Sequence, residues 1–184
     1  MRARWAVSER PIVEPLGGET VFSGRLVDVR LERFRHADGE EVTREVVRHR
    51  GAVGIVANDA ERVWLVRQPR ETVQERLLEI PAGRLDVDGE SPLQAAQREL
   101  AEEVGLGAED WEPLFSFYTS AGFTDECVHL FHATDLHEAS ADSGENERIE
   151  IVPWPLERLE DAIAECRDGK TLIGLLWLAR RLNA

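Results

Sequence analysis

Three glutamates, Glu99, Glu102 and Glu103, share one flank of a segment with helical periodicity over residues 91–104. At about 100° per residue, Glu99 and Glu103 lie about 40° apart, and Glu102 lies about 60° from Glu99. Like charges at this spacing repel by a few tenths of a kcal/mol per pair in an isolated helix. Hard cations such as Mg²⁺ remove the repulsion, because they bind carboxylate oxygens. The spacing therefore predicts either a metal-binding flank or a solvated acidic face in which Glu102 pairs with Arg98.

The helix that carries these glutamates has clear signals at both ends. Ser91 is a natural N-cap, Pro92 suits the first helical position, and Gln94 completes a capping box. Gly105 is typical of the left-handed residue that ends a helix. The apolar stripe that we expect to face the core consists of Leu93, Ala96, Leu100 and Val104.

The segments around this helix have the patterns of strands, followed by two more helices. Residues 1–18, with their prolines and paired glycines, predict an irregular arm, and Asp38-Gly39 predicts a hairpin turn. The helices at the end of the chain are expected at 155–167 and 171–182. The strand-like segments are 20–36, 41–49, 52–57, 62–68, 77–81, 112–119, 126–134 and 148–153. This order predicts a mixed α+β domain with helices packed on a sheet.

The composition excludes several classes of function. With 184 residues, 42% of them apolar, the chain is long enough for one domain with a sizeable core. A formal charge of −14 argues against nucleic-acid binding, which needs clustered basic residues. No apolar run is long enough to span a bilayer, and we expect no signal peptide. Cys127 and Cys166 fit neither a disulfide framework nor a zinc site, which favours a reducing cytoplasm.

The stretch from Gly83 to Leu106 resembles the Nudix signature. It consists of Gly83, six residues, Glu90, seven residues, Arg98-Glu99-Leu100, one residue, Glu102-Glu103, one residue and Gly105-Leu106. The signature has five residues in its first gap, so this chain carries one extra residue before the helix. Because the insertion precedes the helix, we expect the helical positions to keep their register.

The resemblance implies a metal-dependent pyrophosphohydrolase that cleaves a nucleoside diphosphate linked to another group. The implied fold is a Nudix-like α/β/α sandwich, with a mixed sheet, the loop–helix–loop of the signature and C-terminal helices. Mg²⁺, or Mn²⁺, would be held by Glu99 and Glu103, with Glu102 as a further ligand or a partner of the ligands in catalysis. Arg98 would hold the carboxylates by charge-assisted hydrogen bonds, and Glu90 would brace the start of the helix.

Other segments resemble the ADP-ribose pyrophosphatase branch of the family. They are Thr43-Arg44-Glu45-Val46-Val47, Gly51-Ala52-Val53, Val66-Arg67-Gln68-Pro69-Arg70, Leu78-Glu79-Ile80-Pro81-Ala82-Gly83, Ser120-Ala121-Gly122-Phe123-Thr124-Asp125-Glu126 and Glu145-Asn146-Glu147. By this resemblance the Ala82 carbonyl and Glu147 would be metal ligands, and Glu145 would be the general base. The implied substrate-binding residues are Arg44, Glu45, Arg70, Glu79 and Gly122.

The resulting hypothesis is hydrolysis of ADP-ribose to AMP and ribose 5-phosphate by a homodimer. Residues 1–50 would form an N-terminal β region that is exchanged between subunits, and residues 51–184 would form the Nudix domain. Two alternatives stay open: cleavage of another nucleoside diphosphate sugar, and binding of ADP-ribose without cleavage. Arg44 and Arg70 would otherwise be surface arginines, and residues 140–147 a solvated loop. The pattern does not decide which of Glu145 and Glu147 is the base.

Overall fold

The computed structural model describes residues 12–140 and 148–184. The chain divides into two compact units. The first runs to His49 and also takes in Ser120–Asp125, whereas the second comprises Arg50–Thr119 and Glu126–Ala184. Exchange of the first unit between subunits concerns a partner chain and stays a prediction. No helix in the described ranges is long and apolar enough to cross a membrane.

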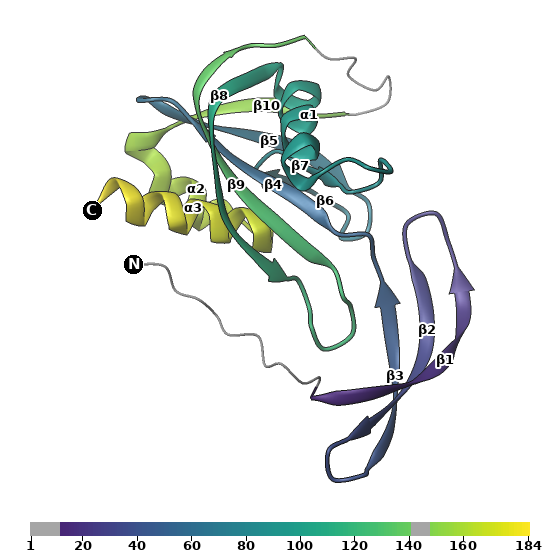
Figure 1. Cartoon of the computed structure of the whole chain (residues 1–184). Coiled ribbons are helices and arrows are strands. Elements are labelled where there is room, and N and C mark those ends of the chain that lie inside the picture. Colours follow the sequence, from purple (N-terminus) through teal and green to yellow (C-terminus); the bar gives the residue numbers. More distant parts are fainter. Residues whose placement is uncertain (1–11, 141–147) are drawn as a thin grey trace. The chain divides into compact units, whose positions relative to one another are not determined.

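The first unit contains an antiparallel sheet in the order β1-β2-β3 (Figure 1). Its strands are β1 (Val13–Ser23), β2 (Asp28–His36) and β3 (Glu41–Arg48). The prediction of an irregular arm as far as residue 18 was wrong, because β1 already pairs with β2 from Val13. Two register shifts in β1 accommodate residues that a regular strand disfavours, one between Pro15 and Gly17 and one between Thr20 and Phe22.

The second unit is built on a seven-stranded mixed sheet with the main path β10-β5-β4-β9-β8. In addition, β6 pairs with β5 and β7 pairs with β4. The neighbours β4 and β9 run parallel, whereas the other pairs are antiparallel. The strands are β4 (Ala52–Asn58), β5 (Arg62–Arg70), β6 (Glu75–Glu79), β7 (Ala82–Arg84), β8 (Leu106–Tyr118), β9 (Cys127–Glu138) and β10 (Glu150–Pro155).

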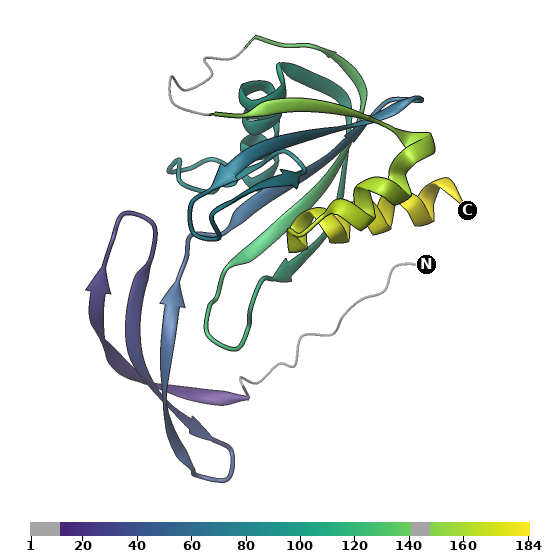
Figure 2. The ribbon, with the colours of Figure 1, turned by 180° about the vertical axis from the view of Figure 1, so that it is seen from behind.

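Helices cover both faces of this sheet (Figure 2). On β4, Val53, Ile55 and Ala57 point to α1 (Pro92–Val104), where they pack with Ala96 and Leu100. Val56 points to the opposite face and packs with residues of α2 (Leu159–Glu165) and α3 (Gly169–Leu182). Because both faces of β4 are buried, its sequence is continuously apolar instead of alternating. The result is the predicted α/β/α sandwich.

The ends of α1 follow the predicted signals. The Ser91 side chain accepts the Gln94 N–H, the Gln94 side chain caps in return, and Gly105 is left-handed at a φ of 74°. The predicted core stripe was partly wrong, because Leu93 is 37% exposed and Ala95 is buried in its place. Leu93 lies in the first turn of α1.

The first C-terminal helix begins later than the pattern predicts, and the second begins two residues earlier. A 3-10 turn, η1 (Leu156–Arg158), precedes α2, and α3 begins at Gly169. Asp168 is the N-cap of α3, and its side chain accepts the Thr171 N–H. The sequence Asp168-Gly169 was expected only to separate the two helices. Its carboxylate in fact starts the second helix, which places Lys170 and Thr171 in the first turn.

Candidate active site

A single arginine binds two carboxylates of α1 and the carboxylate of Glu90, which precedes the helix. Arg98 Nε and Nη2 donate to the two oxygens of Glu90, at 3.0 and 3.1 Å. Its Nη1 donates to Glu99 Oε1 at 2.7 Å and to Glu102 Oε2 at 2.9 Å. The hydrogen bonds to Glu90, followed by the interactions with Glu99 and Glu102, raise the pKa of Arg98 against the effect of burial. Arg98 therefore stays charged and holds three carboxylates together.

Glu103 completes this cluster from the next position of the helix. It is 8% exposed, and its Oε2 accepts the backbone N–H of Ala82 on β7 at 3.0 Å. The contact joins α1 to the strand whose carbonyl is predicted to bind a metal. Glu90, Glu99 and Glu102 share the guanidinium of Arg98, whereas Glu103 binds the backbone of β7. Mostly buried carboxylates that share one guanidinium favour further cations, because burial disfavours an uncompensated charge.

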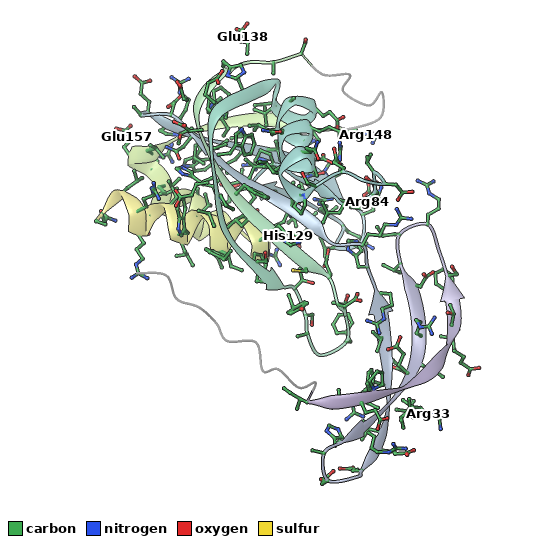
Figure 3. All side chains as sticks on the ribbon, viewed as in Figure 1. Arg33, Arg84, His129, Glu138, Arg148 and Glu157 are labelled. Atoms are coloured by element: carbon green, nitrogen blue, oxygen red, sulfur yellow. The ribbon has the colours of Figure 1, made fainter. Side chains whose placement is uncertain are left out.

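Gly83 makes room for the carboxylate of Glu99. A Cβ atom added at Gly83 would lie 1.9 Å from Cδ of Glu99 and 2.0 Å from its Oε1, so no larger residue fits without moving that carboxylate. Figure 3 shows the next residue, Arg84, at the end of β7 beside α1. The glycine of the signature is thus explained by close approach of a carboxylate to the backbone, not by a turn.

The extra residue of the signature lies between β7 and α1. Leu85 N–H donates to the Gly51 carbonyl at 3.1 Å, and Glu90 N–H donates to the Val87 carbonyl at 3.2 Å. The segment with the additional residue ends in a turn closed by this hydrogen bond of Glu90. Glu90 still reaches Arg98 with both oxygens, so the helical positions keep their register.

Arg70 and Glu79 form a second charged group on the neighbouring strands β5 and β6. Arg70 Nε and Nη2 donate to the two oxygens of Glu79 at 2.6 and 2.7 Å. Glu79 is fully buried, whereas the side chain of Arg70 is 38% exposed. The hydrogen bonds to Glu79 raise the pKa of Arg70 against burial, and the charges of Asp168 and Glu103 add to the effect. Of the α1 glutamates, Glu103 is thus the one whose charge acts on Arg70.

The first turn of α3 supplies residues that the sequence interpretation missed. Lys170 forms ion pairs with Glu79 and, at 3.0 Å, with Asp168. Thr171 Oγ1 donates to Asp168 at 2.6 Å and accepts the Ile80 N–H at 2.9 Å. One signal was available, because Lys170 is the only lysine in the chain. Its partner Glu79 could not be inferred, since the two residues are separated by 91 positions.

Three of the other predicted substrate-binding residues belong to the first unit. Arg44 and Glu45 lie exposed on β3, and Gly122 lies exposed in the loop 120–125. Asp125 anchors that loop to β3 by accepting Arg48 Nη1 at 2.8 Å and the His49 N–H at 2.9 Å. Glu145 and Glu147 lie outside the described residues.

The donor set of α1 suits a divalent cation in chemistry. Glu99 and Glu103 offer carboxylate oxygens, the ligands that Mg²⁺ and Mn²⁺ prefer, and the cluster has excess negative charge. In the two described ranges, no three acidic, histidine or cysteine side chains yet converge tightly enough to enclose an ion. Glu99 and Glu102 both accept a hydrogen bond from Arg98 Nη1 instead.

Replacing Arg98 by methionine is expected to lower the free energy of unfolding by about 3 kcal/mol without divalent cations, because partly buried carboxylates lose their shared partner. Added Mg²⁺ should restore part of the loss, since it neutralises the same charges. Urea unfolding with and without Mg²⁺ measures both effects. Arg84→Met is the control, because among the described residues Arg84 pairs with Asp86 alone, and its side chain is 46% exposed. A loss below about 1 kcal/mol is expected there, and equal losses in the two variants would contradict the role of Arg98.

The signature residues thus meet on one helix and the strand beside it, in the order of a known family. The NUDIX domain family matches residues 47–170, more than half of the chain. The chain belongs to the Nudix family. This confirms the family predicted from Gly83 to Leu106, whose members are generally dependent on divalent metals.

Individual relatives of this Nudix protein bear related names. It is 43% identical over 140 residues to the ADP-ribose pyrophosphatase of Mycobacterium tuberculosis, covering 76% of this chain and 68% of that protein. It is 38% identical over 165 residues to the methanol dehydrogenase activator of Bacillus methanolicus, covering 87% and 89%. The protein is therefore a Nudix hydrolase of the ADP-ribose pyrophosphatase-like group, as predicted.

A solved structure confirms the fold of this Nudix hydrolase. The crystal structure of an ADP compounds hydrolase matches it with a TM-score of 0.82 at 26% sequence identity. The match covers 96% of this chain and 97% of that one. The α+β fold, with a mixed sheet between the signature helix and the C-terminal helices, is thus that of the family.

Proposed function

We propose that this Nudix hydrolase cleaves ADP-ribose to AMP and ribose 5-phosphate with the help of Mg²⁺ or Mn²⁺. The observation that carries the proposal is the carboxylate cluster of α1, fastened to β7 at Ala82 and Gly83 and lying near the guanidinium of Arg70. Carboxylates for metals beside an arginine for phosphate suit a diphosphate substrate. The ADP-ribose pyrophosphatase from M. tuberculosis supports the choice of sugar.

In this proposal, different residues bind the cations, position the carboxylates and bind the diphosphate. Glu99 and Glu103 would hold the cations, and Arg98 keeps Glu99, Glu102 and Glu90 in place before the cations arrive. Arg70 would bind an oxygen of the diphosphate through the side of its guanidinium that Glu79 does not use. When bound, the cations would neutralise charge on the diphosphate and activate a water.

Further contributions to this reaction rest on the resemblance to the branch. The Ala82 carbonyl and Glu147 would add metal ligands, and Glu145 would accept the proton of the attacking water. Glu102 would assist catalysis from the flank of α1. Arg44, Glu45 and Gly122 would complete the substrate pocket, together with Glu79, within a homodimer. A cytoplasmic location is expected for an enzyme of such a substrate.

A panel of nucleoside diphosphate sugars tests the function. The purified protein is incubated with ADP-ribose, ADP-glucose, GDP-mannose or UDP-glucose, with Mg²⁺, Mn²⁺ or EDTA, and products are separated by chromatography. We expect ADP-ribose to give AMP and ribose 5-phosphate fastest, and EDTA to stop the reaction. Faster cleavage of another sugar nucleotide would discard ADP-ribose as the substrate while keeping the mechanism. Binding of ADP-ribose without cleavage of any compound would favour a non-catalytic role.

A second candidate is activation of a dehydrogenase, which the similarity to the B. methanolicus methanol dehydrogenase activator suggests. Adding the protein to a purified methanol dehydrogenase would test it. Stimulation of alcohol oxidation that is lost in the Glu103→Gln variant would make this role depend on hydrolysis. Absence of stimulation would leave nucleotide-sugar cleavage as the function.

A further inference from the structure

Four charged side chains from three elements form a balanced group beside the carboxylate cluster of α1. Glu79 on β6 contacts both Arg70 on β5 and Lys170 on α3, and Lys170 also contacts Asp168. The side chains of Glu79, Lys170 and Asp168 are 1%, 15% and 20% exposed. Two cations and two carboxylates give the group no net charge. Such balance is needed in a buried group, because an unpaired charge there is strongly disfavoured.

The group holds Arg70 in one orientation. Nε and Nη2 of Arg70 both face Glu79, so the guanidinium is fixed edge-on by two parallel hydrogen bonds. Among the described residues, Nη1 has no hydrogen-bond acceptor, and the side chain is 38% exposed. The half-exposed edge with its unused donor is the part of Arg70 that can reach a phosphate oxygen.

Because of Lys170, Arg70 is not the sole counter-charge of Glu79. Glu79 Oε2 accepts from Arg70 Nη2 and from Lys170, so the lysine shares the neutralisation of this carboxylate. Without Lys170, the group of Arg70, Glu79 and Asp168 would carry one net negative charge. That charge would weaken the attraction between Arg70 and an anionic substrate.

Asp168 and Thr171 make the hydrogen bonds that start α3 and attach it to the backbone at Ile80. The Asp168 carboxylate caps α3 through the N–H and hydroxyl of Thr171. Thr171 in turn accepts the Ile80 N–H, which fixes the backbone two residues before Ala82. These hydrogen bonds do not require the Lys170 ammonium. The Lys170 ammonium instead contacts Glu79 and Asp168, the two carboxylates of the balanced group.

We propose that Lys170 is a positioning residue for diphosphate hydrolysis, which keeps Arg70 oriented and its charge available to the substrate by sharing Glu79. The inference rests on the proposed function, because it assigns Arg70 to the diphosphate. It extends the substrate-binding machinery to the first turn of α3, on the opposite face of the sheet from α1.

Kinetics of Lys170→Met on the best substrate of the panel test the proposal. We expect KM to rise roughly tenfold, which is the effect of about 1.4 kcal/mol of lost interaction, and kcat to stay within about twofold. Lys170→Arg should stay near the parent. Arg167→Met is the matched control, because Arg167 pairs with Glu75, also on β6, without touching Glu79. Lys170→Gln serves in the same comparison if the methionine variant does not fold.

A double variant separates positioning from a structural role. If Lys170 acts through Arg70, then Arg70→Gln/Lys170→Met should have nearly the same KM as Arg70→Gln alone. Additive losses of the two substitutions would overturn the proposal. A fall in kcat that only follows a lower melting temperature, with KM unchanged, would also overturn it, because loss of folded enzyme leaves KM unaffected.

The proposal can fail separately from the proposed function. If another nucleotide sugar proves to be the substrate, the same variants are compared on that compound, since all share the diphosphate. If the parent cleaves nothing, the proposed function fails, and calorimetric binding of ADP replaces kinetics. Lys170→Met should then bind ADP roughly tenfold more weakly than the parent. Equal dissociation constants would overturn the role of Lys170.

Discussion

Replacing Glu103 by glutamine is expected to reduce turnover of the best substrate by roughly a hundredfold or more, because the change removes the charge of a predicted metal ligand. The glutamine can still accept the Ala82 N–H that Glu103 accepts at 3.0 Å, so α1 should stay attached to β7. The substitution also removes one negative charge from the glutamate-rich flank of α1. We therefore expect the melting temperature without divalent cations to stay the same or to rise.

Steady-state kinetics over a range of Mg²⁺ concentrations and thermal unfolding in EDTA measure the two effects. Glu165→Gln is the matched control, because Glu165 is also a helical glutamate bound from another element, by Arg67 at 2.6 Å. It lies on α2, on the face of the sheet opposite α1. Parent-like turnover in Glu103→Gln would refute its assignment as a ligand. A large loss of stability would instead show that the Glu103 charge serves the fold.

Replacing Gly83 by alanine is expected to reduce turnover by on the order of tenfold to a hundredfold while the fold persists. The new methyl group would occupy the position of the Glu99 carboxylate, which is the movable end of a flexible side chain. The carboxylate can move away at small cost in stability. It would then lose its place beside β7, and misplacement of a catalytic group by about 1 Å can cost a hundredfold in rate.

The concentration of Mg²⁺ needed for half-maximal activity should rise in Gly83→Ala, since Glu99 is predicted to bind the cation. Gly169→Ala is the control, because a Cβ atom there would meet nothing within 4 Å. Circular dichroism and melting curves establish that both variants are folded. If Gly83→Ala retained parent-like turnover and the same requirement for Mg²⁺, then Glu99 would not need its present position for catalysis.

The sequence determined those features that depend on residues close together in the chain. The ends of α1 follow from Ser91, Gln94 and Gly105, because capping is a contact between a side chain and the backbone within one turn. The spacing of Glu99, Glu102 and Glu103 was enough to predict a shared flank, and together with Arg98 and Glu90 it was enough to identify the family. The strand pattern predicted an α+β domain with helices packed on a sheet, although it placed the start of β1 too late. The helical stripe wrongly placed Leu93 in the core.

Only the tertiary structure decided which charges meet across elements. Glu79 and Lys170 are distant in sequence, and nothing local to either residue distinguishes a partner from a surface charge. The approach of Glu99 to Gly83 depends on how closely α1 packs on β7, which is a property of the packed layers. The sequence therefore specified the helix and its carboxylates, whereas the packing of β5, β6, β7 and α3 specified how Arg70, Glu79 and Lys170 are arranged beside them, because a buried charge is stable only where folding supplies its counter-charge.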